Sequence, residues 1–368
     1  MNDSPLTRLR YAVIGCGGVI APTHLQALAQ IPDAQIVAMS DLDEARGAPR
    51  AEAANVPFFT DYRAMLAEIQ PDVAVICVPH PFHAPIALDC FKAGAHVLVE
   101  KPIAVEVAEA DAMIAAAEAA GRWLAVSFQY RFRPEAAAAR AMIERGELGE
   151  LVRVLAIEPW FRPAAYYQSA GWRGSWRGEG GGVLMNQGPH GLDMLCYLAG
   201  LPKRVWGWTR TRAHAIEVED TAQAMLEFEN GAPGYLYFST VEAGAPRQLQ
   251  IVGDRASIEL QGTQLTIRRF DQPLSEFLAT SKEMFAAPKS QVETPTLPTE
   301  GGGHLAVYLD LQEAIRTGRP PLVHGSEGRQ SLELANAITL SSHLGQPVDL
   351  PIDRAAYHEL LVRLQTAS

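Results

Sequence analysis

Short aliphatic runs alternate with helical patterns over roughly the first 130 residues, and this alternation restricts the fold more than any other feature. RYAVIG, VAVICV and HVLVE are typical of buried strands, while THLQALAQI and APIALDCFKAG between them are typical of helices. Strands fed by helices at this spacing favour parallel βαβ units with both faces of the sheet covered. The sequence therefore predicts a doubly wound α/β domain over residues 1–128.

The pattern changes from about residue 150. Longer alternating strands, such as VEDTAQAMLEFENG and RQLQIVGD, are joined by turn-forming residues. One helical segment, residues 183–200, interrupts them, and residues 271–303 are rich in Pro, Ser, Thr and Gly and indicate an irregular loop. We expect a second, α+β domain over residues 129–368, built on a large, mostly antiparallel open sheet.

Charge and cysteine content restrict the partners and the compartment. The 31 basic and 42 acidic residues give a net charge of -11, which repels nucleic acid and anionic lipid. We see no apolar run of the roughly 18 residues that a membrane span needs and no secretory segment. Cys16, Cys77, Cys90 and Cys196 stand singly, as buried free thiols do. We expect a cytoplasmic protein with a small-molecule substrate, no nucleic-acid partner and no membrane partner.

Glycines follow the first predicted strand in AVIGCGGVIAPTH. Gly15 would allow a tight turn, and Gly17 would let a pyrophosphate approach the backbone ahead of the next helix. The match to G-x-G-x-x-G is imperfect, because Ile20 holds the sixth position and Gly18 suggests a variant turn. A tight turn without a ligand is the alternative. The predicted phosphate-facing residues are Gly15, Gly17, Gly18, Val19 and Ile20.

Asp41 ends the second predicted strand, 24 residues beyond Gly17. An acid at this place accepts hydrogen bonds from the 2′-hydroxyl of an adenosine ribose and repels a 2′-phosphate. NAD is therefore favoured over NADP, although Arg46 could moderate that repulsion.

The strand in HVLVEKPIAV ends abruptly in Glu100, Lys101 and Pro102. Burial of an unpaired ammonium costs several kcal/mol of folding free energy. A lysine at the end of an apolar strand, such as Lys101, therefore indicates a partner for its charge. Ligands of doubly wound folds bind at the carboxyl edge of the sheet, so we expect Lys101 to lie beside a ligand. A cis bond between Lys101 and Pro102 is one possibility that the sequence leaves open.

A second set of polar residues lies in residues 183–200. If this segment is helical, Asn186, His190, Asp193 and Tyr197 share one face. Their amide, imidazole, carboxylate and phenol groups can donate to or accept from a substrate hydroxyl. A solvated stripe on an amphipathic helix is the alternative.

Two further motifs are less specific indicators of a functional site. Trp172 and Arg173 in GWRGSWRGEGGG could belong to a flap over a sugar, or to tryptophans packed at the surface. His80 and His83 stand three apart in HPFH without a third ligand nearby, so we expect no metal site. His83 is instead expected at a helix N-terminus beside the cofactor.

The motifs AVIGCGGVIAPTH, VEKP, GGGVLMNQGPHGLD and VEDTAQAMLEFENGAPG together resemble the glucose-fructose oxidoreductase, inositol dehydrogenase and MocA (Gfo/Idh/MocA) family, over essentially the whole chain. The resemblance implies a Rossmann domain, a C-terminal domain whose sheet forms subunit contacts, and nicotinamide-dependent chemistry on sugars or cyclitols. We expect a homodimer or homotetramer, because alternating strands leave apolar residues such as Leu236 and Phe238 in need of cover.

The resemblance also assigns residues. Lys101 falls on the lysine that sits by the nicotinamide and the reacting hydroxyl, and the D-x-x-x-H-x-x-D pattern falls on Asn186, His190 and Asp193. Asn186 departs from the carboxylate of many members, which removes an anion that could support a histidine base. Further expected cofactor contacts are Pro79, His80, His83, Glu100 and Lys101, and the expected substrate contacts are Lys101, Trp172, Arg173, Asn186, His190 and Asp193.

The expected activity is an NAD(P)-dependent dehydrogenase or reductase acting on CH–OH groups. His190 would act as general base, Lys101 would stabilise the oxygen, and Asp193 would fix a substrate hydroxyl or Lys101. One alternative keeps NAD tightly bound for transient oxidation, as in an epimerase, a lyase or a glycoside-cleaving enzyme. Another is a non-catalytic nucleotide-sensing regulator. The sequence does not name the sugar, the oxidised carbon or the direction.

Overall fold

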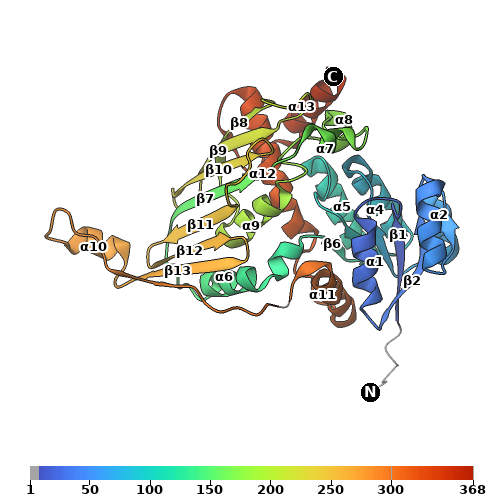
Figure 1. The fold of residues 1–368 in the computed structure, drawn as a ribbon, viewed down its shortest axis with the longest axis horizontal. Helices are drawn as coiled ribbons and strands as arrows, with labels where there is room; N and C mark the ends of the chain where they lie inside the picture. Colours follow the sequence, from blue (N-terminus) through green and yellow to red (C-terminus); the bar gives the residue numbers. More distant parts are fainter. Residues whose placement is uncertain (1–7, 300, 368) are drawn as a thin grey trace. The chain divides into compact units, whose positions relative to one another are not determined.

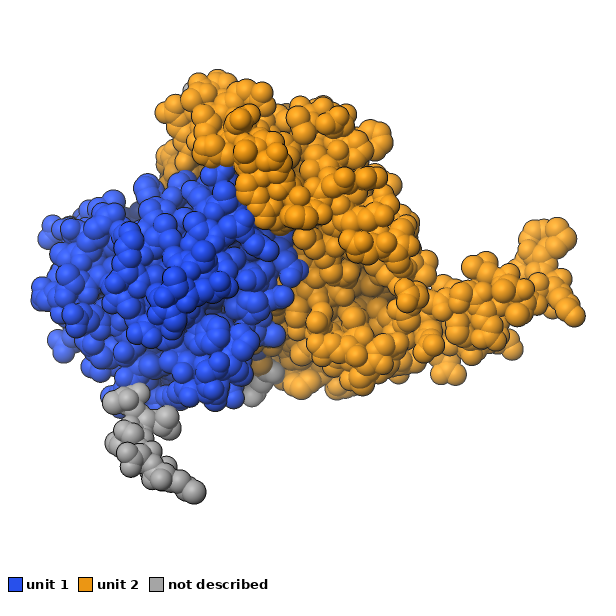
Figure 2. Space-filling model, turned by 180° about the vertical axis from the view of Figure 1, so that it is seen from behind, with its two compact units in different colours: residues 1–129, 302–332 blue, residues 130–301, 333–368 orange. Residues whose placement is uncertain are grey.

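The computed structural model describes residues 8–299 and 301–367, which form two compact units (Figure 1; Figure 2). Unit 1 comprises the residues up to Gln129 together with Gly302–Leu332, and unit 2 comprises Tyr130–Gly301 and the residues from Glu333 onward. The predicted second domain, 129–368, is therefore not continuous. Its segment 302–332 belongs to unit 1.

A parallel sheet of six strands forms the centre of unit 1, in the order β3-β2-β1-β4-β5-β6. Its central strands are aliphatic runs, and all residues of β4 are buried, because helices cover both faces of the sheet. This confirms the predicted doubly wound fold. The strands are β1 (Leu9–Ile14), β2 (Ala34–Ser40), β3 (Phe58–Phe59), β4 (Val73–Ile76), β5 (His96–Val99) and β6 (Leu124–Val126). The helices that connect them are α1 (Ala21–Ala29), α2 (Glu44–Ala53), α3 (Tyr62–Ile69), η1 (His80–Phe82), α4 (His83–Lys92) and α5 (Val107–Ala120).

The strand order of unit 1 reverses between β1 and β4. β2 pairs with one side of β1, and β4 pairs with the other side. In doubly wound folds, ligands bind outside the carboxyl ends of the strands at such a reversal. The segments 15–20, 77–80 and 100–102, which follow β1, β4 and β5, all start at this edge.

The segment 302–332 joins unit 1 through α11 (Gly303–Thr317) and the start of α12 (Gly325–Leu344). Tyr308 of α11 is fully buried, and its ring meets that of Tyr11 edge-on with the centroids 5.8 Å apart. Beside β6, the N–H of Val126 donates to the carbonyl oxygen of Val323 at 3.0 Å. These contacts join residues far apart in the sequence, so a local pattern could not reveal them.

A sheet of nine strands forms unit 2, in the order β14-β13-β12-β11-β7-β10-β9-β8-β15. Neighbouring strands are antiparallel except for β7 and β10, which confirms the predicted mostly antiparallel sheet. The strands are β7 (Leu151–Pro159), β8 (Arg204–Arg210), β9 (Thr221–Glu227), β10 (Pro233–Ser239), β11 (Gln248–Gly253), β12 (Ala256–Gln261), β13 (Gln264–Phe270), β14 (Ser290–Glu293) and β15 (Val348–Asp349).

Helices α6 and α9 pack on one face of this sheet, against β12 and β13 and against β7 and β11, respectively (Figure 1). The stretch 271–303 was predicted as an irregular loop, but it contains both a helix, α10, and the strand β14. The remaining helices are η2 (Gln129–Phe132), α6 (Pro134–Glu144), α7 (Ala164–Gln168), α8 (Trp176–Glu179), α9 (Pro189–Ala199), α10 (Leu274–Thr280) and α13 (Arg354–Thr366).

The two faces of this sheet differ in how far their side chains are buried. Leu236 and Phe238 of β10 are fully buried, so the expectation that they lie on an uncovered face is wrong. The largest exposed apolar side chains of the sheet come instead from the alternate positions of β8 and β9. Trp206 is 58% exposed and pairs across the ladder with Met225, which is 55% exposed.

The cysteines agree with their predicted state, since all four are buried and free. Burial raises the pKa of the Cys16 thiol to about 11, which disfavours a reactive thiolate there. Within the described ranges, no helix is long and apolar enough to span a membrane.

Candidate active site

The turn after β1 requires glycine at its first position. Gly15 has a φ of +85°, and a Cβ atom there would lie 2.7 Å from the carbonyl oxygen of Cys77. A side chain would therefore separate the turn from the end of β4. This confirms the predicted tight turn at Gly15.

The amide groups at the end of this turn are open. α1 begins at Ala21 without a side-chain cap. In the part of the chain that the structure describes, the N–H groups of Val19 and Ile20 have no hydrogen-bond acceptor. Open N–H groups at a helix N-terminus favour a bound phosphate. The geometry therefore fits a pyrophosphate beside Gly17 and Gly18, as the sequence predicts.

Asp41 follows β2 and reaches the same turn. Its carboxylate accepts hydrogen bonds from the N–H of Gly17 at 2.6 Å and from the N–H of Asp43 at 2.9 Å. The residue is half-buried. This position fits the predicted contact with an adenosine ribose.

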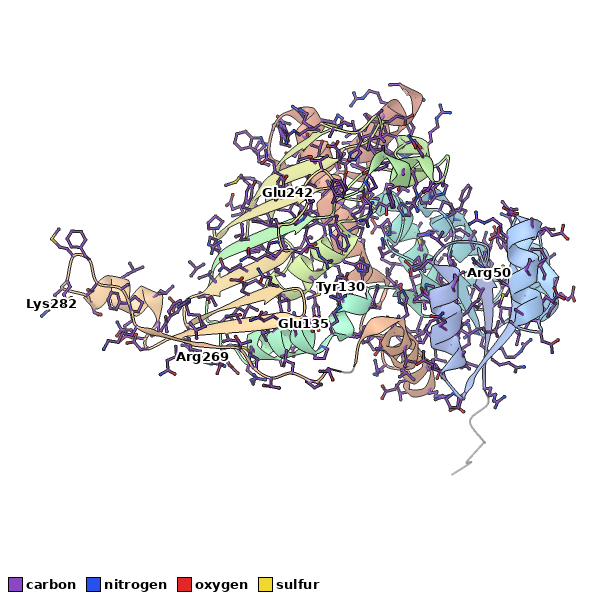
Figure 3. All side chains as sticks on the ribbon, viewed as in Figure 1. Arg50, Tyr130, Glu135, Glu242, Arg269 and Lys282 are labelled. Carbon is purple, nitrogen blue, oxygen red and sulfur yellow. The ribbon has the colours of Figure 1, made fainter. Side chains whose placement is uncertain are left out.

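Arg50 of α2 also contacts the turn, which the sequence analysis did not predict (Figure 3). Its guanidinium donates to the carbonyl oxygen of Gly18 at 2.6 Å and to that of Cys16. The contact holds the turn and adds a positive charge next to it. The spacing of residues along the sequence does not predict this contact, because the atoms that an arginine side chain can reach depend on how its helix packs.

His80 and His83 follow β4, and His83 begins α4 as predicted. Its ring nitrogens lie 2.8 Å from the carbonyl oxygen of Pro102 and 2.9 Å from that of Val78, and burial lowers its pKa. The ring thus connects the segments after β4 and β5, and the cofactor contact of His83 stays a prediction. Contacts of Pro79 and His80 with the cofactor stay predictions.

Lys101 lies directly after β5, at the carboxyl edge of the sheet. It is half-buried, and the bond between Lys101 and Pro102 is cis. This is the place that the sequence predicts for a residue at a ligand. The contact of its ammonium with the nicotinamide and the reacting hydroxyl stays a prediction.

Glu100 is held by histidines of unit 1. Its Oε1 accepts a hydrogen bond from Nε2 of His24 at 2.9 Å and lies 3.7 Å from Nε2 of His304. Burial alone would raise the pKa of Glu100, but these histidines and the charge of Lys101 hold it well below its usual range. The cofactor contact of Glu100 stays a prediction.

The ligand atoms of His24, Glu100 and His304 lie within 4.8 Å of one another, a spacing that a metal ion could use. The hydrogen bonds of this cluster already occupy both ring nitrogens of His24, since Nδ1 lies 2.8 Å from the hydroxyl of Tyr308. We interpret the cluster as a network that fixes Glu100 beside Lys101. The expected absence of a metal site stays a prediction.

In unit 2, α9 carries His190 and Asp193 but begins only at Pro189. Asn186 lies in the turn before the helix, so the predicted shared helical face is wrong for this residue. Glycines and Pro189 break the helical pattern that the sequence suggested. The Asn186 amide donates to Glu179, and its Oδ1 accepts from the hydroxyl of Tyr166 at 3.2 Å.

Glu179 organises the side chains before α9, and the sequence analysis missed it. Its carboxylate is 1% exposed, and Oε1 lies 4.0 Å from Nη1 of Arg173. The Arg173 guanidinium lies 4.3 Å from the ring centroid of Tyr166 and 4.5 Å from that of Trp172. The structure thus brings Trp172, Arg173 and Asn186 into one cluster, and their contact with a substrate stays a prediction.

A second buried carboxylate fills the glycine-rich turn before α9. Glu219 accepts hydrogen bonds from the N–H groups of Gly182 at 2.8 Å and Leu184 at 3.0 Å. Burial raises the pKa of Glu219 to about 7, against the effect of these donors. The turn is therefore held by the protein's own carboxylate.

His190 lies in the first turn of α9 and is 7% exposed. Its ring stacks on that of Tyr130, with the centroids 4.3 Å apart and the planes 15° from parallel. Stacking fixes the plane of the imidazole, as a general base requires. The geometry fits the predicted role of His190.

Asp193 forms a buried ion pair with Arg131. Nη2 of Arg131 donates to Oδ1 at 2.7 Å, Nε donates to Oδ2 at 3.0 Å, and neither residue is more than 1% exposed. Both carboxylate oxygens of Asp193 accept from Arg131, and the contact of Asp193 with a substrate hydroxyl or Lys101 stays a prediction. Asp193 fixes α9, and with it His190.

Two family models match the chain. Residues 9–128 match the oxidoreductase family with an NAD-binding Rossmann fold, and residues 136–259 match the GFO/IDH/MocA C-terminal domain. The first match covers the open turn and Lys101, and the second covers α9.

Individual relatives agree with these matches. D-glucoside 3-dehydrogenase of Escherichia coli is 30% identical over 71% of this chain and 78% of its own length. D-apiose dehydrogenase of Paraburkholderia graminis is 27% identical over 95% of this chain and 92% of its own length. Among solved structures, the WlbA dehydrogenase of Bordetella pertussis, in complex with NADH and UDP-GlcNAcA, is 29% identical with a TM-score of 0.81, covering 94% of this chain and 100% of that one.

Proposed function

Because the chain belongs to the Gfo/Idh/MocA family of oxidoreductases, we propose that it transfers a hydride between NAD and a carbinol of a sugar, a cyclitol or a sugar derivative. The observation that carries the proposal is the open turn after β1 with Asp41 beside it. Relatives named as glucoside and apiose dehydrogenases support the substrate class.

The residues of unit 1 fit the cofactor. The N–H groups of Val19 and Ile20 would bind the pyrophosphate, and Asp41 would accept from the adenosine ribose. A carboxylate in this position favours NAD over NADP, since it would repel a 2′-phosphate. When bound, the nicotinamide supplies the hydride acceptor for oxidation of the carbinol.

Lys101 would stabilise the reacting oxygen. A fixed ammonium beside a developing alkoxide contributes on the order of 10² to 10³ in rate. The carboxylate of Glu100, held by His24, keeps a negative charge next to the lysine and compensates part of the charge of its ammonium.

His190 would take the hydroxyl proton during oxidation and return it during reduction. Its ring is held by stacking on Tyr130, and a positioned general base contributes about 10² to 10⁴ in rate. Asp193 acts here as a positioning residue, because it binds Arg131 and fixes the helix that carries His190.

Trp172, Arg173 and Asn186 would contact the substrate. Their cluster is held by Glu179, which leaves amide, guanidinium and aromatic groups in one place. Such groups suit a sugar, which presents hydroxyls at its edges and apolar C–H groups on its faces.

We also propose that the chain forms a homodimer or homotetramer through the sheet of unit 2. The support is the pair Trp206 and Met225, because large apolar side chains that are more than half exposed on neighbouring strands favour burial against another surface.

A panel assay tests the activity. The purified protein with NAD is offered cyclitols, aldoses and sugar acids, and reduced nicotinamide is followed by absorbance. We expect reduction with at least one compound, and a loss of at least about tenfold in kcat for His190→Ala, the low side of the range for a general base. Wild-type turnover by His190→Ala would remove His190 from the mechanism.

A further inference from the structure

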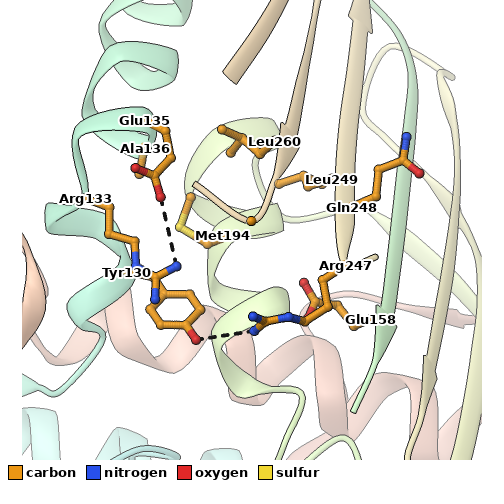
Figure 4. A pocket seen from close by; sticks show the side chains of 11 residues that line it. Tyr130, Arg133, Glu135, Ala136, Glu158, Met194, Arg247, Gln248, Leu249 and Leu260 are labelled. Atoms are coloured by element: carbon orange, nitrogen blue, oxygen red, sulfur yellow. Dashed lines mark hydrogen bonds and ion pairs between the residues drawn. The ribbon is translucent and has the colours of Figure 1, made fainter. Parts of the chain in front are cut away.

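A pocket of unit 2 adjoins the ring of Tyr130, and none of the roles described above uses it (Figure 4). One part of its wall is apolar, from Met194, Leu249 and Leu260, and the other part is polar, from Tyr130, Arg133, Glu158 and Arg247. Tyr130 also stacks on His190, so the pocket lies next to the proposed general base.

Arg247 presents most of its donors to this pocket. Its guanidinium lies 4.1 Å from the ring centroid of Trp160, and Nη1 donates one long hydrogen bond of 3.4 Å to the hydroxyl of Tyr130. A guanidinium carries five N–H donors. Within the described residues, the others have no acceptor, although the side chain is half-buried.

Arg133 presents a second guanidinium to the same pocket. It lies 3.3 Å from the ring centroid of Tyr130, and its Nη1 is 4.0 Å from a carboxylate oxygen of Glu135. This distance is too long for a hydrogen bond. The side chain is 29% exposed, so an incoming ligand can reach it.

Arg131, two residues before Arg133, is an arginine whose guanidinium forms a buried ion pair within the protein. It is buried, and its donors are matched by both oxygens of Asp193. Arg133 and Arg247 lack such a match in the described chain. Their guanidinium groups are therefore available for a ligand.

Glu158 sets the charge of the pocket. It accepts a hydrogen bond from Nε1 of Trp160 at 2.8 Å, and burial raises its pKa to about 7, against the opposing effects of Arg247, Trp160 and Arg133. While Glu158 is protonated, two guanidinium groups face a single carboxylate, that of Glu135. The pocket then carries a net positive charge.

We propose that this pocket binds an anionic substituent of the substrate, a carboxylate or a phosphate, through Arg133 and Arg247. Guanidinium groups bind both anions by charge-assisted, paired hydrogen bonds. The proposal rests on the proposed function, because it places the reacting carbinol near His190 and the anionic group on the other side of Tyr130. It narrows the substrate class to sugar acids, sugar phosphates and their derivatives.

Binding of matched sugar pairs tests this proposal. The protein loaded with NADH is titrated with D-glucose, D-glucuronate and glucose 6-phosphate, with the corresponding galactose compounds, and with UDP-glucose and UDP-glucuronate, and nicotinamide fluorescence reports binding. We expect at least one uronate or sugar phosphate to bind at least about tenfold more tightly than its counterpart without the added anionic group, since hydrogen bonds to charged groups are the stronger ones. Preference for uronates or for phosphates identifies the group that binds.

Arg247→Met and Arg133→Met are each expected to remove this preference and to change the affinity for the neutral sugar by less than about twofold. Arg268→Met is the matched control, because Arg268 lies on β13, outside this pocket, and donates to Ser290. The proposal is overturned if no anionic compound is preferred, or if the preference survives both pocket substitutions.

The same compounds separate this proposal from the proposed function. If neutral and anionic sugars reduce NAD equally well, the pocket proposal fails and the activity stands. If no compound reduces NAD, yet anionic sugars bind in a manner that Arg247→Met abolishes, the pocket proposal stands and the activity fails.

Discussion

The glycine-rich turn after β1 and the one before α9 differ in one respect: the first has open N–H groups and the second does not. After β1, the N–H groups of Val19 and Ile20 have no acceptor among the residues described. Before α9, the N–H groups of Gly182 and Leu184 are both bound by the carboxylate of Glu219. Each turn presents donors to an anion, but unit 2 supplies the anion itself. A glycine-rich turn therefore indicates a ligand site only when no buried carboxylate fills it.

The arginines of unit 2 show the same difference. Arg131 is matched by Asp193, whereas Arg247 has one long hydrogen bond. Where a polar side chain is hydrogen-bonded to a partner within the protein, we expect its substitution to lower the free energy of unfolding. Where a polar side chain has donors without an acceptor, we expect its substitution to change ligand affinity.

The largest effect is expected for Asp193→Ala. It leaves the buried Arg131 charge without its partner, which costs about 3–5 kcal/mol of unfolding free energy. Arg247→Met should change the same quantity by less than about 1 kcal/mol. Urea denaturation followed by circular dichroism measures both. Equal losses in the two variants would contradict the distinction between matched and open arginines.

A matched variant sharpens this test. Arg131→Met combined with Asp193→Leu removes both charges and keeps apolar volume, so it should recover much of the stability lost in Asp193→Ala. Recovery of stability would show that the loss in Asp193→Ala comes from the unpaired charge of Arg131 and not from lost packing.

The closed turn predicts a pH dependence of stability. The pKa of Glu219 is raised by burial from 4.5 to about 7 in the folded protein, so the folded state binds this proton more tightly than the unfolded chain. The resulting stabilisation is complete below about pH 4.5 and is lost as the pH rises through about 7, by up to about 3 kcal/mol. Glu219→Gln should flatten this dependence in denaturation at a series of pH values. An unchanged slope would show that Glu219 does not titrate as described.

The exposed face of the unit 2 sheet predicts an effect on assembly. Trp206→Ala should weaken self-association by about 2 kcal/mol, the loss typical of a central interface tryptophan. Sedimentation at micromolar concentration measures it, with Leu309→Ala of unit 1, also exposed, as the control. A stable wild-type monomer would contradict the proposed assembly.

The open turn predicts a smaller effect on cofactor choice. Asp41→Ala removes the acceptor for the ribose hydroxyls and the repulsion of a 2′-phosphate, so the ratio of NAD to NADP affinity should fall about tenfold, or about 1.4 kcal/mol. Fluorescence titration with both reduced nucleotides measures this ratio. A change within twofold would show that Asp41 does not bind the ribose.

The features of unit 1 that follow from backbone geometry could be predicted from the sequence. The aliphatic runs gave the parallel sheet, and Gly15 and Asp41 lie where strand ends and a left-handed turn place them. The path of 302–332 was not predictable, because contacts such as Tyr308 with Tyr11 depend on distant segments.

In unit 2, the partners of the motif side chains could not be predicted from the sequence. Asp193 fits the family pattern, but Arg131, which only the fold brings near, occupies its oxygens. Asn186 lies before the helix, because Pro189 begins α9 and the turn is held by Glu219. Long-range pairing of polar groups is not encoded in spacing along the chain.

The most direct test of the proposed activity is a single-turnover measurement of nicotinamide reduction with excess protein, using the substrate found in the panel. We predict stoichiometric reduced nicotinamide in the wild type. Lys101→Met should slow its formation by about 10² to 10³, because it keeps the length of the side chain but removes the charge at the reacting oxygen. NAD affinity should remain within about twofold. Reduction at the wild-type rate in Lys101→Met would contradict the role of Lys101, and no reduction with any compound by the wild type would contradict the dehydrogenase itself.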